Sequence, residues 1–313
     1  MSDILISVVV PIYNSCNSLE HCISTILCQS HRFIEVICVD DKSSDGSREI
    51  LQTLAKKDQR IKLILLDYNV GAAKARNIGI DASLGKYIGF IDSDDEILDK
   101  DMYRKLLFQC ECHGLDFCKS RLIVNRLGKE TAQTELLNNY YTLENKFELI
   151  PFAPSIVAGL YNGDFLKKFN VNYGNYKIGS HDVIFHLSSL FYARKIGYIN
   201  DICYRYNFLS NSTSISSSRN PDDIIFVFSK VVLKLYNELL NDKKISFYLM
   251  TAAINYFNYY VRYGYINKSN FKKMNKIIKL LRKKIHEEDL TTDALLYSEK
   301  YDVFLQKFYK RLI

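Results

Sequence analysis

The chain contains no tryptophan, and no apolar run approaches the roughly 18–20 residues that a membrane-spanning helix needs. The N-terminal residues lack a basic stretch followed by a long apolar segment, so we expect no secretory signal peptide. The eight cysteines are scattered and lack the paired spacing of a zinc site, which favours free thiols in a reducing compartment. These absences favour a cytoplasmic protein. Its 313 residues, 48% of them hydrophobic, can form one large α/β domain and an appendage.

The net charge of +7 is concentrated in one part of the chain. Residues 221–313 carry 17 Lys and Arg against 10 Asp and Glu, whereas residues 1–220 carry 25 of each. The pattern after residue 221 is helical to the end of the sequence. We therefore expect a neutral globular domain over residues 1–220 and a basic, helical C-terminal region over residues 221–313.

The hydrophobic pattern of about the first ninety residues alternates between strand-like apolar runs and segments of helical periodicity. Strands are expected at residues 4–10, 33–39, 61–66 and 87–91, and helices from near residue 19, over 47–57 and over 71–82. This order is typical of a mostly parallel sheet with helices on both faces. Further along, the pattern predicts a strand over 117–124, a helix over 180–193 and a strand over 196–206.

Polar side chains follow three of the expected strands at the point where each strand ends. Tyr13 and Asn14 follow the first strand, Asp40 and Asp41 follow the second, and an acidic cluster follows the fourth. Sheets of this kind bind ligands at the carboxyl ends of their strands. The three clusters are therefore candidates for one binding site.

The acidic cluster contains Asp92, Asp94 and Asp95, with Ser93 between them. So much negative charge at the mouth of a sheet is costly unless a cation binds there. Mg²⁺ and Mn²⁺ prefer carboxylate oxygens and keep open positions for phosphate, so the cluster is a candidate metal and diphosphate site. The alternative is a solvated helix N-terminus with an aspartate as its cap.

Three other segments carry weaker signals, each with an ordinary structural alternative. Asp40 or Asp41 can accept a hydrogen bond from a pyrimidine base or from ribose, or can belong to a polar turn. Lys74 and Arg76 can reach a diphosphate, or can be solvated cations on a surface helix. Asp182 lies in the first turn of a predicted helix, where the helix dipole alone favours a carboxylate.

These motifs occur in a fixed order along the chain. They are Val8-Val9-Val10-Pro11-Ile12-Tyr13-Asn14, the Asp-Asp-x-Ser-x-Asp-Gly turn at 40–46, the Gly-x-x-x-Ala-Arg-Asn helix start at 71–77 and Asp-Ser-Asp-Asp at 92–95. Together they resemble the family 2 glycosyltransferases of the GT-A fold. The resemblance is strong from about residue 5 to 100, continues more weakly to Asp182 and the Tyr204-Arg205 strand, and fades after about 220.

The resemblance implies an inverting transferase that takes one sugar from a nucleotide-sugar donor, with UDP as the expected nucleotide and Mn²⁺ or Mg²⁺ as the cofactor. By analogy, Asp41 or Asp40 would bind uracil, and Asp92 and Asp94 would hold the ribose and the metal that bridges the diphosphate. The implied donor-binding residues are Pro11, Tyr13, Asn14, Asp40, Asp41, Lys74, Arg76, Asp92 and Ser93, and the implied metal ligands are Asp94, Asp92 and Asp95.

The catalytic base is implied at Asp182. Many members of the family carry a Glu-Asp pair near the acceptor site, and the matching position here reads His181-Asp182. Asp182 matches the base, whereas His181 departs from the first acid. The departure puts in question the acceptor contact that this acid normally makes, and His181 is the residue expected at the acceptor site.

The missing tryptophan separates the chain from one branch of the family. Processive members, similar to cellulose and hyaluronan synthases, use a Gln-x-x-Arg-Trp motif and membrane helices. We therefore expect addition of one sugar per encounter to a glycan or lipid-linked acceptor, in surface polysaccharide or lipooligosaccharide synthesis. One alternative is a nucleotidyltransferase, although residues 13–17 do not read as its glycine-rich, basic phosphate loop. Another is a non-catalytic, membrane-docked nucleotide-sugar binder, which the departure at His181 supports.

Segment 271–285 predicts an amphipathic helix with apolar residues on one face and lysines on the other. The helix can attach peripherally to the anionic inner face of a membrane, or can simply be a solvated surface helix. Nucleic-acid binding is disfavoured because the rest of the chain is neutral. A Ser/Asn-rich loop with Ser212, Thr213 and Ser214 can close over the nucleotide, with Arg205 near its base.

Overall fold

The computed structural model describes residues 3–133, 139–142, 156–174 and 181–208, together with Lys276. The chain divides into two compact units, of which Met1–Lys146 and Pro154–Ser217 form the first. Every described residue except Lys276 lies in this unit. The loop around Ser212 and almost all of segment 271–285 fall outside the described residues, so the expected boundary near residue 220 stays a prediction.

The first part of the unit alternates between strands and helices as the periodicity predicts. Its elements are β1 (Ile6–Ile12), α1 (Leu19–Leu27), β2 (Ile34–Asp40), α2 (Ser47–Lys57), β3 (Ile61–Leu65), α3 (Ala72–Ala82) and β4 (Tyr87–Phe90). Every residue of β1 and β2 is buried, which explains why these strands read as continuous apolar runs rather than alternating ones. All pairings among these four strands are parallel.

Strand β1 continues through Pro11 to Ile12, two residues beyond the expected end at residue 10. Pro11 pairs with Val39 of β2, whereas β4 pairs with β1 only as far as Val9. At Pro11 the strand therefore has a neighbouring strand on one side only. Proline has no N–H to donate, and it is tolerated where no neighbouring strand needs that donor.

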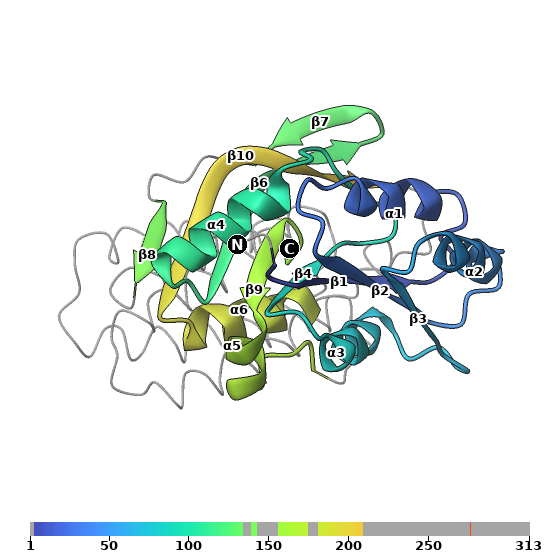
Figure 1. Ribbon diagram of the computed structural model, residues 1–313, viewed down its shortest axis with the longest axis horizontal. Coiled ribbons are helices and arrows are strands. Elements are labelled where there is room, and N and C mark those ends of the chain that lie inside the picture. Colours follow the sequence, from blue (N-terminus) through green and yellow to red (C-terminus); the bar gives the residue numbers. More distant parts are fainter. Residues whose placement is uncertain (1–2, 134–138, 143–155, 175–180, 209–275, 277–313) are drawn as a thin grey trace, which may run out of the picture. The chain divides into compact units, whose positions relative to one another are not determined.

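The strand order reverses at β1. The order β3-β2-β1-β4 means that the chain moves outward to β3 and then returns to the other side of β1. The helices consequently change faces, and Figure 1 shows α1 above the sheet and α3, α5 and α6 below it. The carboxyl ends of β1 and β4 flank this switch point, which is where open α/β sheets bind ligands.

The second part of the unit extends the sheet beyond β4. Its elements are β5 (Glu96–Ile97), α4 (Met102–His113), β6 (Phe117–Arg126), β7 (Lys129–Ala132), β8 (Tyr140–Thr142), β9 (Gly159–Asn162), α5 (Gly163–Lys168), α6 (His181–Tyr192) and β10 (Lys195–Phe208). Strand β9 lies antiparallel between β4 and β6, and β10 runs parallel to β6. The sheet as a whole is therefore mixed, and the predicted α/β class is confirmed.

Helix α3 packs very close to β1 because Gly79 has no side chain. A Cβ atom at Gly79 would lie 2.3 Å from a methyl carbon of Val9. At this point α3 lies against β1 with no side chain of its own in between. Arg76, in the N-terminal half of α3, pairs with Asp92 just after β4.

Candidate active site

The loops that follow β1 and β2 are joined into one platform. The backbone N–H of Asn14 donates to Ser43 Oγ at 3.0 Å, and the N–H of Ser15 donates to Ser47 Oγ at 2.9 Å. In return, the N–H of Ser44 donates to Asn14 Oδ1 at 2.9 Å. These reciprocal bonds fix the two loops relative to one another at the carboxyl edge of the sheet.

Asp45 is the anionic centre of this platform. Its carboxylate accepts from the N–H of Cys16 at 2.9 Å, from the N–H of Ser47 at 3.1 Å and from Ser47 Oγ at 2.6 Å. Burial alone would raise the pKa of Asp45, but these hydrogen bonds to the ionised form outweigh it and lower the pKa to about 2. Asp45 therefore stays ionised and holds the loops together.

Asp40 and Asp41 are buried and have internal partners. Asp40 forms an ion pair with Arg48 at 2.5 Å, and the carboxylate of Asp41 accepts from the N–H groups of Val70 and Gly71 at 2.5 and 2.8 Å. Asp41 thus ties the end of β2 to the start of α3. Each carboxylate oxygen has a second lone pair, so the expected contact with uracil stays a prediction.

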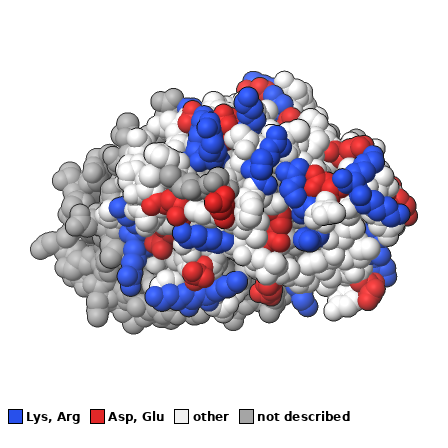
Figure 2. Space-filling model, viewed as in Figure 1, with Lys and Arg blue, Asp and Glu red and all other residues white. Residues whose placement is uncertain are grey.

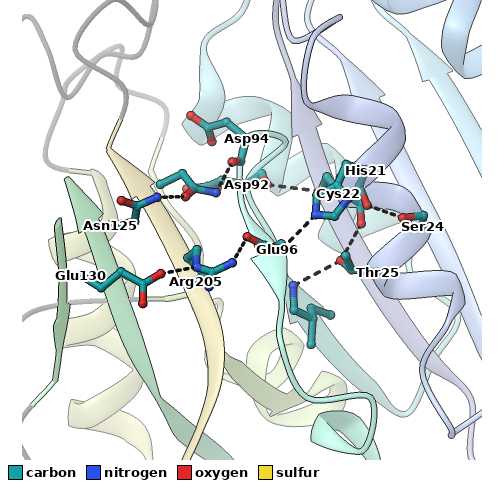
Figure 3. Close-up of polar contacts among 12 residues, drawn as sticks. His21, Cys22, Ser24, Thr25, Asp92, Asp94, Glu96, Asn125, Glu130 and Arg205 are labelled. Atoms are coloured by element: carbon teal, nitrogen blue, oxygen red, sulfur yellow. Dashed lines mark hydrogen bonds and ion pairs between the residues drawn. The ribbon is translucent and has the colours of Figure 1, made fainter. Parts of the chain in front are cut away.

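Ser93 connects the acidic cluster to the loop after β1. Its Oγ lies 2.6 Å from Ser15 Oγ, and its carbonyl accepts from Ser18 Oγ at 2.9 Å. Ser18 is the N-cap residue of α1, and its hydroxyl is used for this contact instead of capping the helix. The thiol of Cys22 donates to the Asp92 carbonyl at 3.4 Å, which attaches α1 a second time (Figure 3).

Asp95 connects the acidic cluster to β10. Its carboxylate accepts from Tyr204 Oη at 2.6 Å and from the N–H of Asn207 at 2.7 Å, and the residue is 1% exposed. Burial and the neighbouring carboxylates Asp92 and Asp94 raise its pKa well above the ordinary value. These two donors fix the position of the Asp95 carboxylate, and its expected role as a metal ligand stays a prediction.

Of the three carboxylates in the acidic cluster, that of Asp94 has the fewest protein donors among the described residues. Figure 3 shows the carboxylate directed away from the hydrogen bonds that link β10 to α1. Burial, followed by repulsion from Asp92, raises its pKa to about 6. No described side chain donates a hydrogen bond to it. The residues that the structure covers also contain no group of three or more His, Cys, Asp or Glu arranged to hold a metal ion.

Arg76 joins the acidic cluster to the start of α6. Its guanidinium forms an ion pair with Asp92 through Nη2, and Nη1 lies 3.7 Å from Asp182 Oδ1 and 2.6 Å from His181 Nε2. The Arg76 side chain is 5% exposed. Asp92 and His181, which are 16 and 105 positions from Arg76 in the sequence, therefore meet at its side chain.

His181 contacts both Arg76 and Asp182 through one ring nitrogen. Its Nε2 lies 2.6 Å from Arg76 Nη1 and 3.1 Å from Asp182 Oδ1. The residue is 6% exposed and packs edge-on against Tyr173 at 6.0 Å between ring centroids. The expected acceptor contact of His181 stays a prediction, and the ring has little surface to offer an acceptor.

Asp182 is surrounded by basic groups. Its Oδ1 lies 3.1 Å from His181 Nε2 and 3.7 Å from Arg76 Nη1, and its side chain is 38% exposed. Burial would raise its pKa, but His181, Arg76 and, more weakly, the buried Lys119 lower it below the ordinary value. Burial in turn lowers the pKa of Lys119 to about 8. Asp182 is therefore a partly exposed carboxylate that is ionised at neutral pH, and its Oδ1 atom, which faces these groups, is itself buried.

An aromatic cluster holds α6 in place beneath these groups. Phe185, one helical turn after Asp182, packs against Phe90 at 5.3 Å and stacks on Tyr173 at 4.4 Å between centroids. Phe90 is the last residue of β4, and the Arg76 guanidinium lies 5.4 Å from the Tyr173 ring centroid. The core thus fixes Asp182 relative to the acidic cluster.

The other predicted site residues differ in their exposure. Tyr13 is 41% exposed and Lys74 is exposed, whereas Pro11 is buried in β1 and Arg76 in α3. Arg205 forms ion pairs with Glu96 and Glu130, and its expected place near the nucleotide stays a prediction. Figure 3 shows these pairs, which continue from Glu96 to His21 on α1. Sequence reasoning did not assign roles to Tyr173, Tyr204 or Asn207, because their contacts with the site cross between distant elements.

The topology and the carboxylates at the switch point define a GT-A glycosyltransferase, and comparisons with known proteins agree. The sequence profile described as "Glycosyl transferase family 2" matches residues 7–160. GlyG of Streptococcus pneumoniae is 31% identical over 257 residues, which cover 73% of this chain and 79% of GlyG. The chain belongs to glycosyl transferase family 2.

Two further similarities are informative. The Bacillus subtilis glycosyltransferase TuaG, named for teichuronic acid biosynthesis, is 42% identical over 107 residues; these cover 34% of this chain and only 42% of TuaG. The crystal structure of S. aureus TarS in complex with UDP-GlcNAc superposes with a TM-score of 0.76 at 20% identity, covering 90% of this chain and 81% of that one. The likeness to TarS shows the fold.

Proposed function

We propose that the protein is an inverting glycosyltransferase that moves a single sugar from a UDP-linked donor to a hydroxyl of a glycan or lipid-linked acceptor. The observation that carries the proposal is the placement of two carboxylates on the two terminal nitrogens of Arg76. Asp92 lies at the end of β4, and Asp182 lies at the start of α6. Transfer needs a donor-side carboxylate and a separate base, and these two residues meet both needs.

A divalent cation, Mn²⁺ or Mg²⁺, would be held by Asp94. Its carboxylate lacks a side-chain donor in the described part of the chain, and its raised pKa reflects negative charge that a cation would offset. Mg²⁺ in phosphate sites often binds through one or two carboxylates and takes its other ligands from phosphate and water, so no three-residue cluster is required. Asp92, with 23% side-chain exposure, is the candidate second ligand, whereas Asp95 is held by Tyr204 and Asn207. When bound there, such a cation would supply positive charge to offset the charge of the departing diphosphate.

Asp182 would act as the general base. It takes the proton of the acceptor hydroxyl while that oxygen attacks the anomeric carbon from the face opposite the diphosphate. The bond from the anomeric carbon to the diphosphate oxygen breaks, UDP leaves with the electron pair, and the configuration inverts. The lowered pKa keeps Asp182 ionised at neutral pH, and general-base catalysis typically contributes about 10²–10⁴-fold.

The nucleotide would lie over the platform formed by the loops after β1 and β2. The exposed ring of Tyr13 and the side chain of Asn14 border this platform, and Asp41 remains the proposed partner of uracil. Lys74, exposed in the first turn of α3, is the proposed contact to the diphosphate. Ser93 would lie beside the ribose, held by Ser15.

The acceptor is proposed to belong to a cell-surface polysaccharide or lipooligosaccharide. TuaG is named for teichuronic acid biosynthesis, and TarS was solved with UDP-GlcNAc, which makes UDP-GlcNAc the first donor to test. A cytoplasmic enzyme of this kind could reach a lipid-linked acceptor through the basic segment 271–285, which we propose binds the anionic inner membrane face. None of the described helices is long and apolar enough to cross a membrane.

Nucleic acid is not a proposed partner. Figure 2 shows basic and acidic side chains interspersed over the face of the described residues that it presents, rather than one basic stripe. A nucleic-acid footprint requires such a stripe or patch. The balanced charge of residues 1–220 agrees with a site for one small anionic donor held by a metal.

The test is a panel of nucleotide-sugars, beginning with UDP-GlcNAc, assayed with Mn²⁺ and with EDTA for donor hydrolysis, sugar transfer and thermal stabilisation. We expect activity with a UDP-sugar only in the presence of metal, and Asp182→Asn should lower turnover by about 10²-fold while UDP affinity is retained. Stabilisation by UDP without turnover of any sugar would favour a non-catalytic nucleotide-sugar binder. Release of pyrophosphate from a nucleoside triphosphate would instead identify a nucleotidyltransferase.

A further inference from the structure

Arg76 lies between the two ends of the proposed reaction. Nη2 forms an ion pair with Asp92 on the donor side, and Nη1 lies 3.7 Å from Oδ1 of Asp182, the proposed base. A guanidinium is planar and its donors have a fixed geometry. The separation between the two carboxylates is therefore set by one rigid group rather than by two independent side chains.

The buried guanidinium of Arg76 stays charged and so keeps its ion pairs with Asp92 and Asp182. Burial would lower the pKa of Arg76, but the charges of Asp92 and Asp182 outweigh it and raise the pKa, so the group stays cationic. Its Nε has no hydrogen-bond partner in the described part of the chain, and its guanidinium carbon lies 5.4 Å from the Tyr173 ring centroid. The polar contacts of the side chain consequently pass through the two terminal nitrogens.

His181 supports the guanidinium from a third direction. Its Nε2 lies 2.6 Å from Nη1 of Arg76, the same nitrogen that faces Asp182. The neighbour of the base in the sequence therefore holds the cation that the base faces. At the position where the family commonly has an acid, His181 therefore contacts a buried arginine of the same chain.

We propose that Arg76 is a positioning residue, held by His181, that fixes the base Asp182 relative to the donor-side carboxylate Asp92. The inference rests on the proposed function, and it gives Arg76 a role that does not require contact with the diphosphate. If Arg76 acts through Asp182, its contribution must depend on the presence of an ionised base. A residue that only stabilises the fold or only binds donor would contribute equally with or without that base.

A double-mutant cycle between Arg76→Lys and Asp182→Asn separates these roles. Lysine keeps the positive charge, but a single ammonium cannot hold two carboxylates in the geometry of a guanidinium. We expect Arg76→Lys to lower kcat by about tenfold in the wild-type background and by less than about twofold in the Asp182→Asn background. The dissociation constant of UDP, measured with Mn²⁺, should change by less than about threefold in each case.

Arg60→Lys is the matched control. Arg60 also pairs with an aspartate, Asp58, at 2.7 Å, and it lies between α2 and β3 outside the proposed site. This variant should retain the wild-type kcat. His181→Phe is a second probe that keeps an aromatic ring beside Tyr173 but removes the ring nitrogen that contacts Arg76. It should show the same dependence on Asp182, even if Arg76→Lys does not fold.

Equal losses of kcat in the two backgrounds, for Arg76→Lys or for His181→Phe, would overturn the positioning role. So would a loss seen only as weaker UDP binding, which would make Arg76 a donor-binding residue. These results presuppose an active wild-type enzyme. A wild-type protein that turns over no member of the nucleotide-sugar panel would overturn the proposed function itself, and the two failures are thus distinguishable.

Discussion

Removing the charge of Asp94 should make the metal-free protein more stable while it abolishes metal-dependent donor binding. Burial beside Asp92 raises the pKa of Asp94 from the ordinary 3.8 to about 6. Each pH unit of such a shift corresponds to about 1.4 kcal/mol, so the ionised carboxylate costs the folded state up to about 3 kcal/mol at pH 7. Structural relaxation and solvent screening reduce this figure, and we expect Asp94→Asn to raise the free energy of unfolding by about 1–3 kcal/mol.

The sign of the pH dependence follows from the raised pKa. Between pH 3.8 and about 6 the folded protein binds more protons at Asp94 than the unfolded chain does. The cost of the carboxylate is therefore fully present above about pH 6, shrinks as the pH falls through this window and disappears below about 3.8. The gain from Asp94→Asn should consequently fall to about 0.5 kcal/mol or less near pH 4.

Urea unfolding in EDTA, followed by circular dichroism, measures this prediction. The exposed Asp67, changed to Asn, is the control and should leave the free energy of unfolding unchanged. With Mn²⁺ and UDP at about 100 times the dissociation constant, the wild type should gain about 2.7 kcal/mol and Asp94→Asn should gain almost nothing. An Asp94→Asn protein that is no more stable than wild type at pH 7, or that is equally stabilised at pH 4, would refute the reasoning.

Three further predictions concern other parts of the chain. Gly79→Ala should lower the free energy of unfolding by about 1–3 kcal/mol because the new Cβ would lie 2.3 Å from a methyl carbon of Val9, and an added Val9→Ala should recover part of the loss in the same urea assay. Asp45→Ala should lower the free energy of unfolding by about 1–2 kcal/mol at pH 7. The pKa of Asp45, lowered to about 2, contributes stability that is present above pH 3.8 and lost as the pH falls through 2. If Asp45→Ala lowers the free energy of unfolding equally at pH 2, the role of the hydrogen bonds with Ser47 is contradicted. Charge reversal of three lysines in segment 271–285 should weaken sedimentation with anionic vesicles at low salt but leave activity on a short soluble acceptor intact, and wild-type protein that ignores such vesicles would leave the segment as an ordinary surface helix.

The elements of the first half could be predicted because their signals are local. Helix α2 covers residues 47–57 as its periodicity predicts, and strands β1 to β4 lie within a few residues of the expected strands. The carboxyl ends of parallel strands meet at one edge, so the sequence also indicated that the clusters at Asn14, Asp41 and Asp92 share a site. The short strands β7 and β8 were not predicted, since three or four residues carry little periodicity.

The contacts within the site could not be read from the sequence. Arg76, in a helix of small residues, reads equally well as a solvated cation, and only the close packing of α3 on β1 brings it to Asp92. The family resemblance implies Asp95 as a metal ligand, and this stays a prediction; what the sequence did not reveal is that strand β10 supplies Tyr204 and Asn207 to its carboxylate. Neither donor is near Asp95 in the sequence.

By itself, the sequence determined the class of fold, the family motifs and the edge of the sheet at which the polar residues gather. These follow from periodicity and from motif order, which depend on neighbours along the chain. The tertiary structure decided which partners the carboxylates meet. Asp95 accepts hydrogen bonds from Tyr204 and Asn207, no described side chain donates to Asp94, and Asp92 and Asp182 face the same guanidinium, because long-range packing determines which donors lie near each carboxylate.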